Sequence, residues 1–400
     1  ILDRSWIKMK DFSFAKVKMW VKQELVLTIA LLLGCVSSFF NTPHLYYIDW
    51  DVLCVLWALM VVVAGLKTVK FLDWTAVELL NCCKTYKQVI VALVGLTFVS
   101  SMFVTNDVAL LTFVPLALVI GRTIKMDMPQ VIILQTLGAN LGSMFTPPGN
   151  PQNLFLYAHY NYSALGFFKV MLFPTVLSVI YIGVIIYLKR NKELQLDLPA
   201  LAKPDRKLTT IYLVLLALNV GAVLHLLDKY IALVITAVVV LAVNRKLVKE
   251  VDYSLLLTFI GFFIFIGNIS HTDLVSYLRD HILGSTEGTY FAALISSQFI
   301  SNVPAAMLLA GLTREADALL LGVNIGGLGT LIASMASVIS YKLFAAEHPY
   351  QAGSYLRMFL FYNFLGLVLI GAVTYFVCVV NYIDYLDVSV FREMTEYLHF

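Results

Sequence analysis

Charged residues are scarce in this sequence. Only 13% of its 400 residues are Asp, Glu, Lys or Arg, whereas 60% are hydrophobic. A soluble domain cannot bury that share of apolar side chains, because its own surface must be polar. Apolar stretches of about 20 residues recur along the chain, and each can cross about 30 Å of hydrocarbon as a helix. The composition therefore excludes a soluble protein and predicts one all-α polytopic membrane domain over residues 1–400.

Several motifs of enzymes and metal sites are also missing. The five cysteines and seven histidines have no zinc, redox or HExxH spacing. No GxxxxGK[ST] loop is present, which argues against ATP as a driving force within this chain. An intramembrane enzyme would need two acids or a Ser–Lys pair at depth, and only Asp107 lies deep in an apolar segment. We expect neither an enzyme nor a covalent cofactor, and no nucleic-acid partner. The net charge of +3 by itself says nothing about such a partner.

Apolar spans, polar interruptions and charged linkers divide the chain into consecutive parts. The first part is basic and mildly amphipathic, which fits an interfacial helix or an ordinary cytoplasmic tail equally well. The predicted parts are a cytoplasmic or interfacial N-terminal segment (1–24), repeat 1 (45–190), a cytoplasmic linker (191–208), connecting spans (209–245), repeat 2 (250–382) and an acidic C-terminal tail (383–400).

The order of elements occurs twice. Residues 100–106 align with residues 296–302, and residues 138–142 align with residues 322–326 further along. Matches in the same order in both halves indicate an internal repeat rather than chance.

The distribution of basic residues predicts how the two repeats are oriented. We treat residues 105–107 and 301–303 as the tips of re-entrant hairpins, and we place the N-terminus in the cytoplasm. Most of the 28 Lys and Arg residues then fall on the cytoplasmic side, as in known membrane proteins. The two repeats enter the membrane from opposite faces in this topology, and the C-terminus is external. Inverted-topology repeats with discontinuous transmembrane helices are typical of secondary transporters.

Four interruptions of apolar helices, two in each repeat, could meet near the membrane midplane. Helix breaks at that depth survive only where they are buried or line a wet cavity. Freed carbonyls suit a cation, and helix N-termini suit an anion. A lone Asn in an apolar helix is often only a packing residue, but both repeats place one beside a break. The predicted substrate-binding residues are Thr105, Asn106, Asp107, Asn140, Thr146, Pro147, Asn150, Ser301, Asn302, Pro304, Asn324, Thr330 and Ser334.

Asp107 is the one acid that this topology places away from the end of a span. Ionisable groups at such depth are expensive, so they are functional candidates. Asp107 could bind Na⁺ or carry a proton, and it could equally cap the helix that starts at Val108. Repeat 2 has Val303 at the equivalent position, so this charge is asymmetric.

At these residues the chain resembles the ion transporter superfamily, which includes divalent anion–sodium symporters, citrate transporters, arsenite permeases and certain sodium–proton antiporters. The most similar branch is that of bacterial inner-membrane proteins with a citrate-transporter-like domain. The motifs that carry the resemblance are Thr105 to Leu110, Asn150-Pro151-Gln152-Asn153, Ser301-Asn302-Val303-Pro304 and Asn324-Ile325-Gly326-Gly327.

The resemblance implies two Na⁺ sites, a homodimer and an elevator-like movement of the hairpins and broken helices. By similarity, the ligands of the first site are Ser101, Thr105, Asn106 and Gly142, and those of the second are Ser297, Ser301, Asn302 and Gly326. The third residue of each tip is Asp107 or Val303, whereas the anion symporters have Thr there.

The resemblance also implies a function. We expect a multi-pass inner-membrane protein that transports a small anion, a carboxylate in the first interpretation, by symport with Na⁺ or H⁺. The alternative is a Na⁺/H⁺ antiporter or an arsenite or metalloid efflux permease, because the acid at the first tip, Asp107, resembles those branches of the superfamily.

Overall fold

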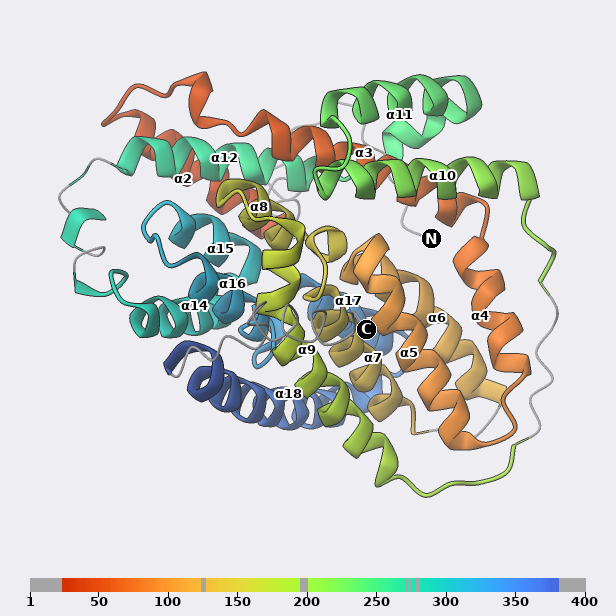
Figure 1. The fold of residues 1–400 in the computed structure, drawn as a ribbon. Coiled ribbons are helices and arrows are strands. Elements are labelled where there is room, and N and C mark those ends of the chain that lie inside the picture. The colour runs from red at the N-terminus through yellow and green to blue at the C-terminus, as the bar shows by residue number, and fades with distance from the viewer. Residues whose placement is uncertain are drawn as a thin grey trace, which may run out of the picture. The chain divides into compact units, whose positions relative to one another are not determined.

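The computed structural model describes residues 24–123, 127–194, 201–270, 272, 275–277 and 281–380, and these residues are almost entirely helical (Figure 1). The predicted N-terminal segment, apart from Glu24, and the predicted acidic tail lie outside the described residues. Two compact units are present. They are Ile1–Asp49 with Asp252–His271, and Trp50–Val251 with Thr272–Phe400.

The smaller unit is held together by close packing of two helices. Helix α2 (Leu25–Ser38) lies against α12 (Tyr253–Ile269), and the short helix η1 (Leu45–Tyr47) follows α2. A Cβ atom on Gly34 would lie 3.0 Å from the carbonyl oxygen of Gly261, so the two backbones nearly touch. Small residues permit this kind of contact between membrane helices.

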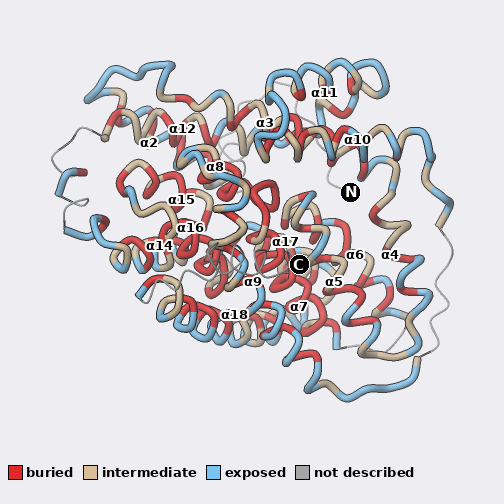
Figure 2. The backbone as a smooth tube through the Cα atoms, viewed as in Figure 1, coloured by how far each residue is buried: buried red, intermediate tan, exposed pale blue. Residues whose placement is uncertain are grey.

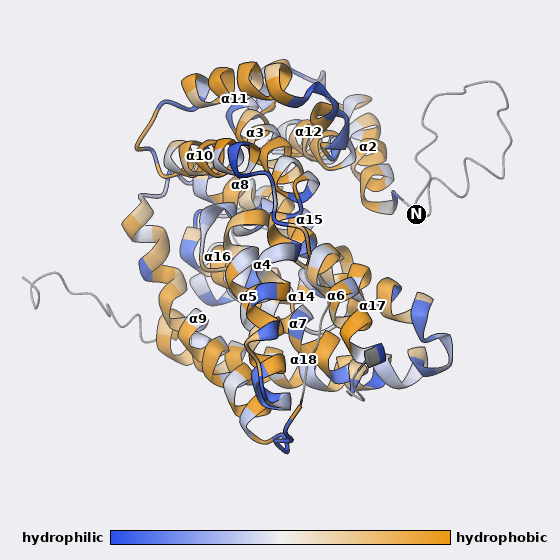
Figure 3. Cartoon of the chain, turned by 90° about the vertical axis from the view of Figure 1, so that its right-hand side faces the viewer, coloured by the Kyte–Doolittle hydropathy of each residue, from blue (hydrophilic) through white to orange (hydrophobic). Residues whose placement is uncertain are grey.

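In the larger unit, three helices pack together as one group. They are α3 (Trp50–Thr68), α10 (Arg206–Val223) and α11 (Lys229–Asn244), with η3 (Arg245–Glu250) at the end of α11. Asn219 donates a hydrogen bond to the Thr236 hydroxyl at 2.8 Å, and Lys229 forms an ion pair with Asp51. The outer side of α11 is strongly hydrophobic (Figure 3). An apolar face of this kind suits contact with lipid.

The remaining helices of this unit surround two buried helices, α7 and α16 (Figure 2). Helix α5 packs on α7, α14 on α16, α6 on α17, and α15 on α8. Their bounds are α4 (Phe71–Asn81), α5 (Tyr86–Val104), α6 (Asn106–Thr123), α7 (Met128–Ser143), η2 (Pro147–Gly149), α8 (Pro151–His159), α9 (Ala164–Tyr187), α14 (Thr286–Ile300), α15 (Asn302–Ala310), α16 (Ala316–Ile325), η4 (Leu331–Ala333), α17 (Met335–Glu347), η5 (Pro349–Gln351), α18 (Ala352–Thr374) and η6 (Tyr375–Val380).

Many of these helices suit a bilayer. Within the described residues, six helices are long and apolar enough to cross a membrane, and several shorter apolar helices accompany them. The predicted connecting spans, residues 209–245, are confirmed as the helices α10 and α11. The predicted interruptions of the apolar segments are also present, but each hairpin tip is a break of a single residue, Thr105 or Ser301. The chain is thus a polytopic helical membrane protein.

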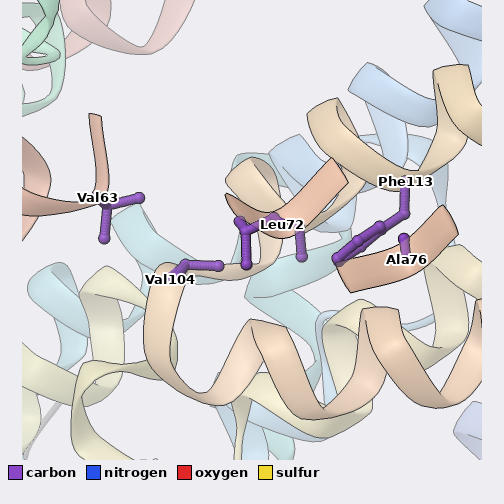
Figure 4. Packing of buried hydrophobic residues seen from close by; sticks show 6 residues of the cluster. Val63, Leu72, Ala76, Val104 and Phe113 are labelled. Atoms are coloured by element: carbon purple, nitrogen blue, oxygen red, sulfur yellow. The ribbon is translucent and has the colours of Figure 1, made fainter. Parts of the chain in front are cut away.

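An apolar cluster supports the first of these breaks. Val104 precedes the break, and it packs with Val63 of α3, Leu72 and Ala76 of α4, and Phe113 of α6 (Figure 4). Helix α4 therefore buries its apolar face against the helices on both sides of Thr105. This packing fixes the position of the polar residues that follow the break.

Candidate functional site

The two hairpin tips have the same backbone conformation. Thr105 ends α5 with φ 72° and ψ 153°, and Ser301 ends α14 with φ 73° and ψ 154°. Almost only glycine adopts this region without strain, and a residue with a side chain there costs about 1–3 kcal/mol. In both cases a new helix starts at the next residue, an asparagine. Such strain at matched positions is typical of a functional site rather than of ordinary packing.

Asn140 is the centre of one buried polar network. Its Oδ1 accepts hydrogen bonds from the Asn106 amide at 3.2 Å and from the Ser334 hydroxyl at 3.0 Å. Its own amide nitrogen donates to the Ser337 hydroxyl at 3.2 Å. Asn106 Oδ1 in turn accepts from the backbone N–H of Asp107 at 3.0 Å. The first hairpin tip is therefore joined through Asn140 to the residues that begin α17.

Asn324 is the centre of a second network. Its amide nitrogen donates to Asn153 Oδ1 at 2.6 Å, and its Oδ1 accepts from the Asn150 amide at 3.2 Å. Asn150 also caps α8, because its Oδ1 accepts from the backbone N–H of Asn153. The end of α16 is therefore joined to the beginning of α8.

The two networks are reciprocal. Asn140 aligns with Asn324 in the repeat. Asn140 bonds to Ser334 and Ser337, and Asn324 bonds to Asn150 and Asn153. These partners also correspond, because Asn150 aligns with Ser334 and Asn153 aligns with Ser337. Each central asparagine thus bonds to the other half of the chain, at corresponding residues. All of these side chains are buried. Buried polar groups need hydrogen-bond partners, and here they find them in one another. The networks therefore fix the positions of the ends of α7 and α16 relative to the beginnings of α8 and α17.

Within each half, a threonine ties the second break to the hairpin. Thr146 Oγ1 donates to the carbonyl oxygen of Met102 at 2.5 Å, and Thr330 Oγ1 donates to that of Gln298 at 2.8 Å. Glycine makes this approach possible at Gly142, where a Cβ atom would lie 2.3 Å from the Phe98 carbonyl oxygen. The break in each buried helix is therefore held against the hairpin of the same half.

The other predicted residues lie near the breaks, where they bond to backbone carbonyls, permit close contacts or start a helix. Ser101 and Ser297 are buried, and each hydroxyl donates to a carbonyl of its own helix. The Ser301 hydroxyl donates to the Ala333 carbonyl at 3.4 Å. A Cβ atom on Gly326 would lie 2.9 Å from Ser297 Oγ, and one on Gly327 would lie 2.9 Å from Asn302 Nδ2. Two prolines shape the backbone, Pro147 in η2 and Pro304 in the first turn of α15.

The electrostatics of the site come from helix ends and amides. Helices α6, α8, α15 and α17 begin at the breaks, and their N-termini carry partial positive charge. Helices α5, α7, α14 and α16 end there, with carbonyl groups that lack helical partners. Among the described residues of the two networks there is no Lys, Arg or His. The arrangement offers donors to an anion and carbonyl oxygens to a cation without a basic side chain.

Two amide side chains that were not among the predicted site residues lie beside the breaks, and one of them, Asn153, belongs to the Asn324 network. Asn153 accepts from Asn324, and its own amide nitrogen bonds to the carbonyls of Met144 and Thr146. Gln298 bonds to the loop that follows α16. Each is an amide in an apolar helix beside a break, which is the signal that could have found them.

The comparisons with known proteins agree with this architecture. A family model described as citrate transporter matches residues 16–319. An uncharacterized transporter of Methanocaldococcus jannaschii is 33% identical over 320 residues, which covers 79% of this chain and 87% of that protein. The inner membrane protein YbiR of Escherichia coli is 27% identical over 298 residues, or 74% of this chain and 80% of that protein.

A shorter similarity extends to a putative transporter, arsB, of Dictyostelium discoideum. It is 24% identical over 148 residues, which is 37% of this chain and 26% of that protein. The family match covers most of the chain, and the proteins named above are membrane or transport proteins rather than enzymes. The chain therefore belongs to the citrate transporter family of the ion transporter superfamily, and it is an integral membrane transport protein.

Proposed function

We propose that this protein is a secondary active transporter of a small anion, with a carboxylate as the substrate class and Na⁺ or H⁺ as the coupling ion. The observation that carries the proposal is the pair of reciprocal amide networks centred on Asn140 and Asn324. Ser143 links the two networks, and Ser301 of the second tip bonds to the Ala333 carbonyl beside Ser334, so four helix breaks contribute to one buried polar region. Helix breaks with buried polar residues are the usual substrate and ion sites of secondary transporters.

The same networks support an inverted repeat. Two copies that exchange bonds at corresponding residues behave like the two sides of a two-fold interface. A two-fold axis in the membrane plane would turn one repeat upside down relative to the other. Alternating access would then arise when the hairpins and broken helices move together against α3, α10 and α11 in an elevator-like step.

The helix ends support an anionic substrate. Ser334 starts α17, but its hydroxyl donates to Asn140 and forms no cap to the helix. Backbone N–H groups of the first turn of α17 therefore remain free of side-chain competition and can bind a carboxylate oxygen. The carbonyl ends of α5 and α7 and the carboxylate of Asp107 offer the opposite charge to the coupling ion.

Uptake into liposomes tests the proposal. The purified chain is reconstituted, a Na⁺ or H⁺ gradient is imposed, and uptake of labelled citrate and succinate is measured. We expect saturable accumulation that needs the gradient. Flux that is equal with and without a gradient would indicate a channel and would contradict the proposal.

Asp107 favours one alternative, a Na⁺/H⁺ antiporter or a metalloid efflux permease. An acid in the first turn of α6 can exchange a proton for a cation without any anionic substrate. The same liposomes separate the two functions. Proton movement driven by Na⁺ alone supports antiport, whereas proton or Na⁺ movement that needs citrate or succinate supports symport.

Asp107→Asn is expected to change the ion dependence of transport. The substitution removes a negative charge beside the first tip and keeps the size of the side chain, so cation binding should weaken by about tenfold, or 1.4 kcal/mol. Uptake is measured against Na⁺ concentration and against pH.

The control is Asp317→Asn, which removes an acid from the first turn of α16, at the other end of that helix from the site. We expect no change in ion dependence from this control. An unaltered ion and pH profile for Asp107→Asn would reduce Asp107 to a helix-capping role.

We further propose a homodimer with a cytoplasmic N-terminus and an external C-terminus in the inner membrane. The orientation predicts that Cys82, an exposed residue at the end of α4, faces the cytoplasm. A membrane-impermeant maleimide should label a single-cysteine Cys82 variant in inverted vesicles and not in intact cells. A single cysteine at Ser285, before α14, should give the opposite pattern, and labelling of Cys82 from outside would refute this topology.

A further inference from the structure

Helix α8 ends in a contact with the loop that follows α10. Tyr157, in the last turn of α8, is 1% exposed, and its ring stacks on the ring of His225 with the centroids 5.2 Å apart and an interplanar angle of 20°. Its hydroxyl oxygen lies 3.3 Å from His225 Nδ1, within hydrogen-bond distance. A buried tyrosine hydroxyl needs a partner, and His225 supplies it. One hydrogen bond and one ring stack therefore join α8 to α10.

His225 occupies a backbone position that glycine or asparagine usually fills. It follows α10 with φ 59°, its N–H donates to the Ala222 carbonyl, and the N–H of Leu226 donates to the Gly221 carbonyl. These two bonds define a Schellman motif with His225 as its left-handed residue. The end of α8 has the same motif, with Asn161 at φ 50°. A left-handed backbone is strained for a residue with a Cβ atom, so a histidine there indicates a role for its side chain.

The loop that carries His225 is fixed to α3 and α11. Asp228 caps α11, because its Oδ1 accepts from the backbone N–H of Tyr230 at 2.9 Å. Lys229 forms an ion pair with Asp51 in the first turn of α3, and the Tyr230 hydroxyl donates to the same carboxylate at 2.5 Å. His225 therefore belongs to the group of helices α3, α10 and α11.

The turn that carries Tyr157 is fixed to the second repeat instead. The Tyr160 hydroxyl donates to the Thr313 carbonyl, which follows α15, at 3.1 Å. The Tyr162 hydroxyl donates to Asp317 in the first turn of α16 at 2.6 Å. At its other end α8 takes part in the second amide network. Both ends of α8 thus belong to the group formed by the hairpins and broken helices.

We propose that the contact between Tyr157 and His225 is a latch that holds the hairpins and broken helices against α3, α10 and α11 in one end state of the elevator-like step. This inference rests on the proposed function. Helix α8 also packs on α3, but α3 is apolar over most of its length, and apolar packing of this kind can slide. A hydrogen bond needs one geometry, so the latch must break whenever the two groups move past each other.

The distance between two spin labels tests the latch without transport. In a background without the five cysteines, one label replaces the exposed Leu226, beside His225, and the other replaces the exposed Arg314, in the loop before α16. We expect one main distance in the otherwise unchanged protein. Tyr157→Phe, which keeps the ring stack, and His225→Gly, which suits the left-handed backbone, should each populate a second distance. The ratio of the two populations should change about threefold to tenfold, as expected for the loss of one hydrogen bond.

Asn161→Gly is the matched control. It places glycine at the corresponding position after α8 and leaves Tyr157 and His225 in place, so the label distances should not change. The double variant of Tyr157→Phe and His225→Gly should change the populations no more than the larger single change does, because both substitutions remove the same contact.

Apparent substrate affinity gives a second measurement. A latch that favours one end state favours binding from one side of the membrane. Both latch variants should therefore raise the half-saturating concentration of citrate or succinate on one side and lower it on the other, in intact cells compared with inverted vesicles. A residue that only maintains the fold would weaken binding from both sides.

The possible outcomes separate the latch from the transport function. Label distances that neither Tyr157→Phe nor His225→Gly alters, or equal weakening of binding from both sides, would overturn the latch while the transport function stands. Absence of gradient-driven uptake by the wild type would instead overturn the proposed function, and the label distances would still report on the contact between α8 and α10.

Discussion

Asn106→Ala and Asn302→Ala are each expected to abolish gradient-driven transport without unfolding the protein. Asn106 donates to Asn140 and accepts from the Asp107 backbone, so alanine removes the link between the first tip and the Asn140 network. A buried group left without its partner costs about 1–3 kcal/mol per bond. Two such losses correspond to a decrease of about 100-fold in transport, since 1.4 kcal/mol is a factor of ten.

Controls for this experiment lie on the same hairpins. The Thr112 hydroxyl bonds only within α6, to the Val108 carbonyl, and the Ser296 hydroxyl bonds only within α14, to the Ala293 carbonyl. Alanine at either position should leave uptake within about twofold of wild type, because local helical bonds of this kind contribute little. Uptake and thermal unfolding are measured for all four variants. Wild-type uptake by both asparagine variants would show that the tips do not form the transport site.

The locations of the helix breaks could be predicted from the sequence. The pairs Thr105-Asn106 and Ser301-Asn302 follow a similar run of residues in both halves, and Pro147, Pro148 and Pro151 cannot continue a helix. The structure interrupts its helices at these places. The number of residues that separate the two helices of each hairpin was harder to predict. Asn106 and Asn302 already belong to the following helices, because a single residue in an unusual conformation makes the whole turn.

The pairing across the two halves could not be predicted in the same way. Alignment shows that Asn140 corresponds to Asn324, but it does not show that each bonds to the opposite half. That choice follows from how α6 packs on α17 and α15 on α8, and side-chain contacts of this kind depend on packing over the whole unit. In the sequence, Gln298 stands out only as part of the alignment of residues 296–302 with residues 100–106. Its importance appears when three carbonyl groups converge on its nitrogen.

Glycine at the strained tip positions is expected to stabilise the protein and to impair transport. Thr105 and Ser301 hold a conformation that costs about 1–3 kcal/mol for a residue with a side chain. Thr105→Gly and Ser301→Gly should recover part of that energy, less the entropy of about 0.5–1 kcal/mol that glycine loses on folding. Each melting temperature in detergent should therefore rise, whereas uptake should fall about tenfold because a hydroxyl at the breaks is lost and the tip is less rigid.

Thr105→Ser separates the two effects. It keeps both the hydroxyl and a side chain in the strained conformation, so its melting temperature and its uptake should stay close to those of the wild type. A lower melting temperature for both glycine variants would mean that the tips are not strained. Higher stability together with undiminished uptake would mean that the strain is not needed for transport. The expected combination, higher stability with lower uptake at both tips, would mean that the protein gives up stability to hold Asn106 and Asn302 rigidly at the point where its two halves meet.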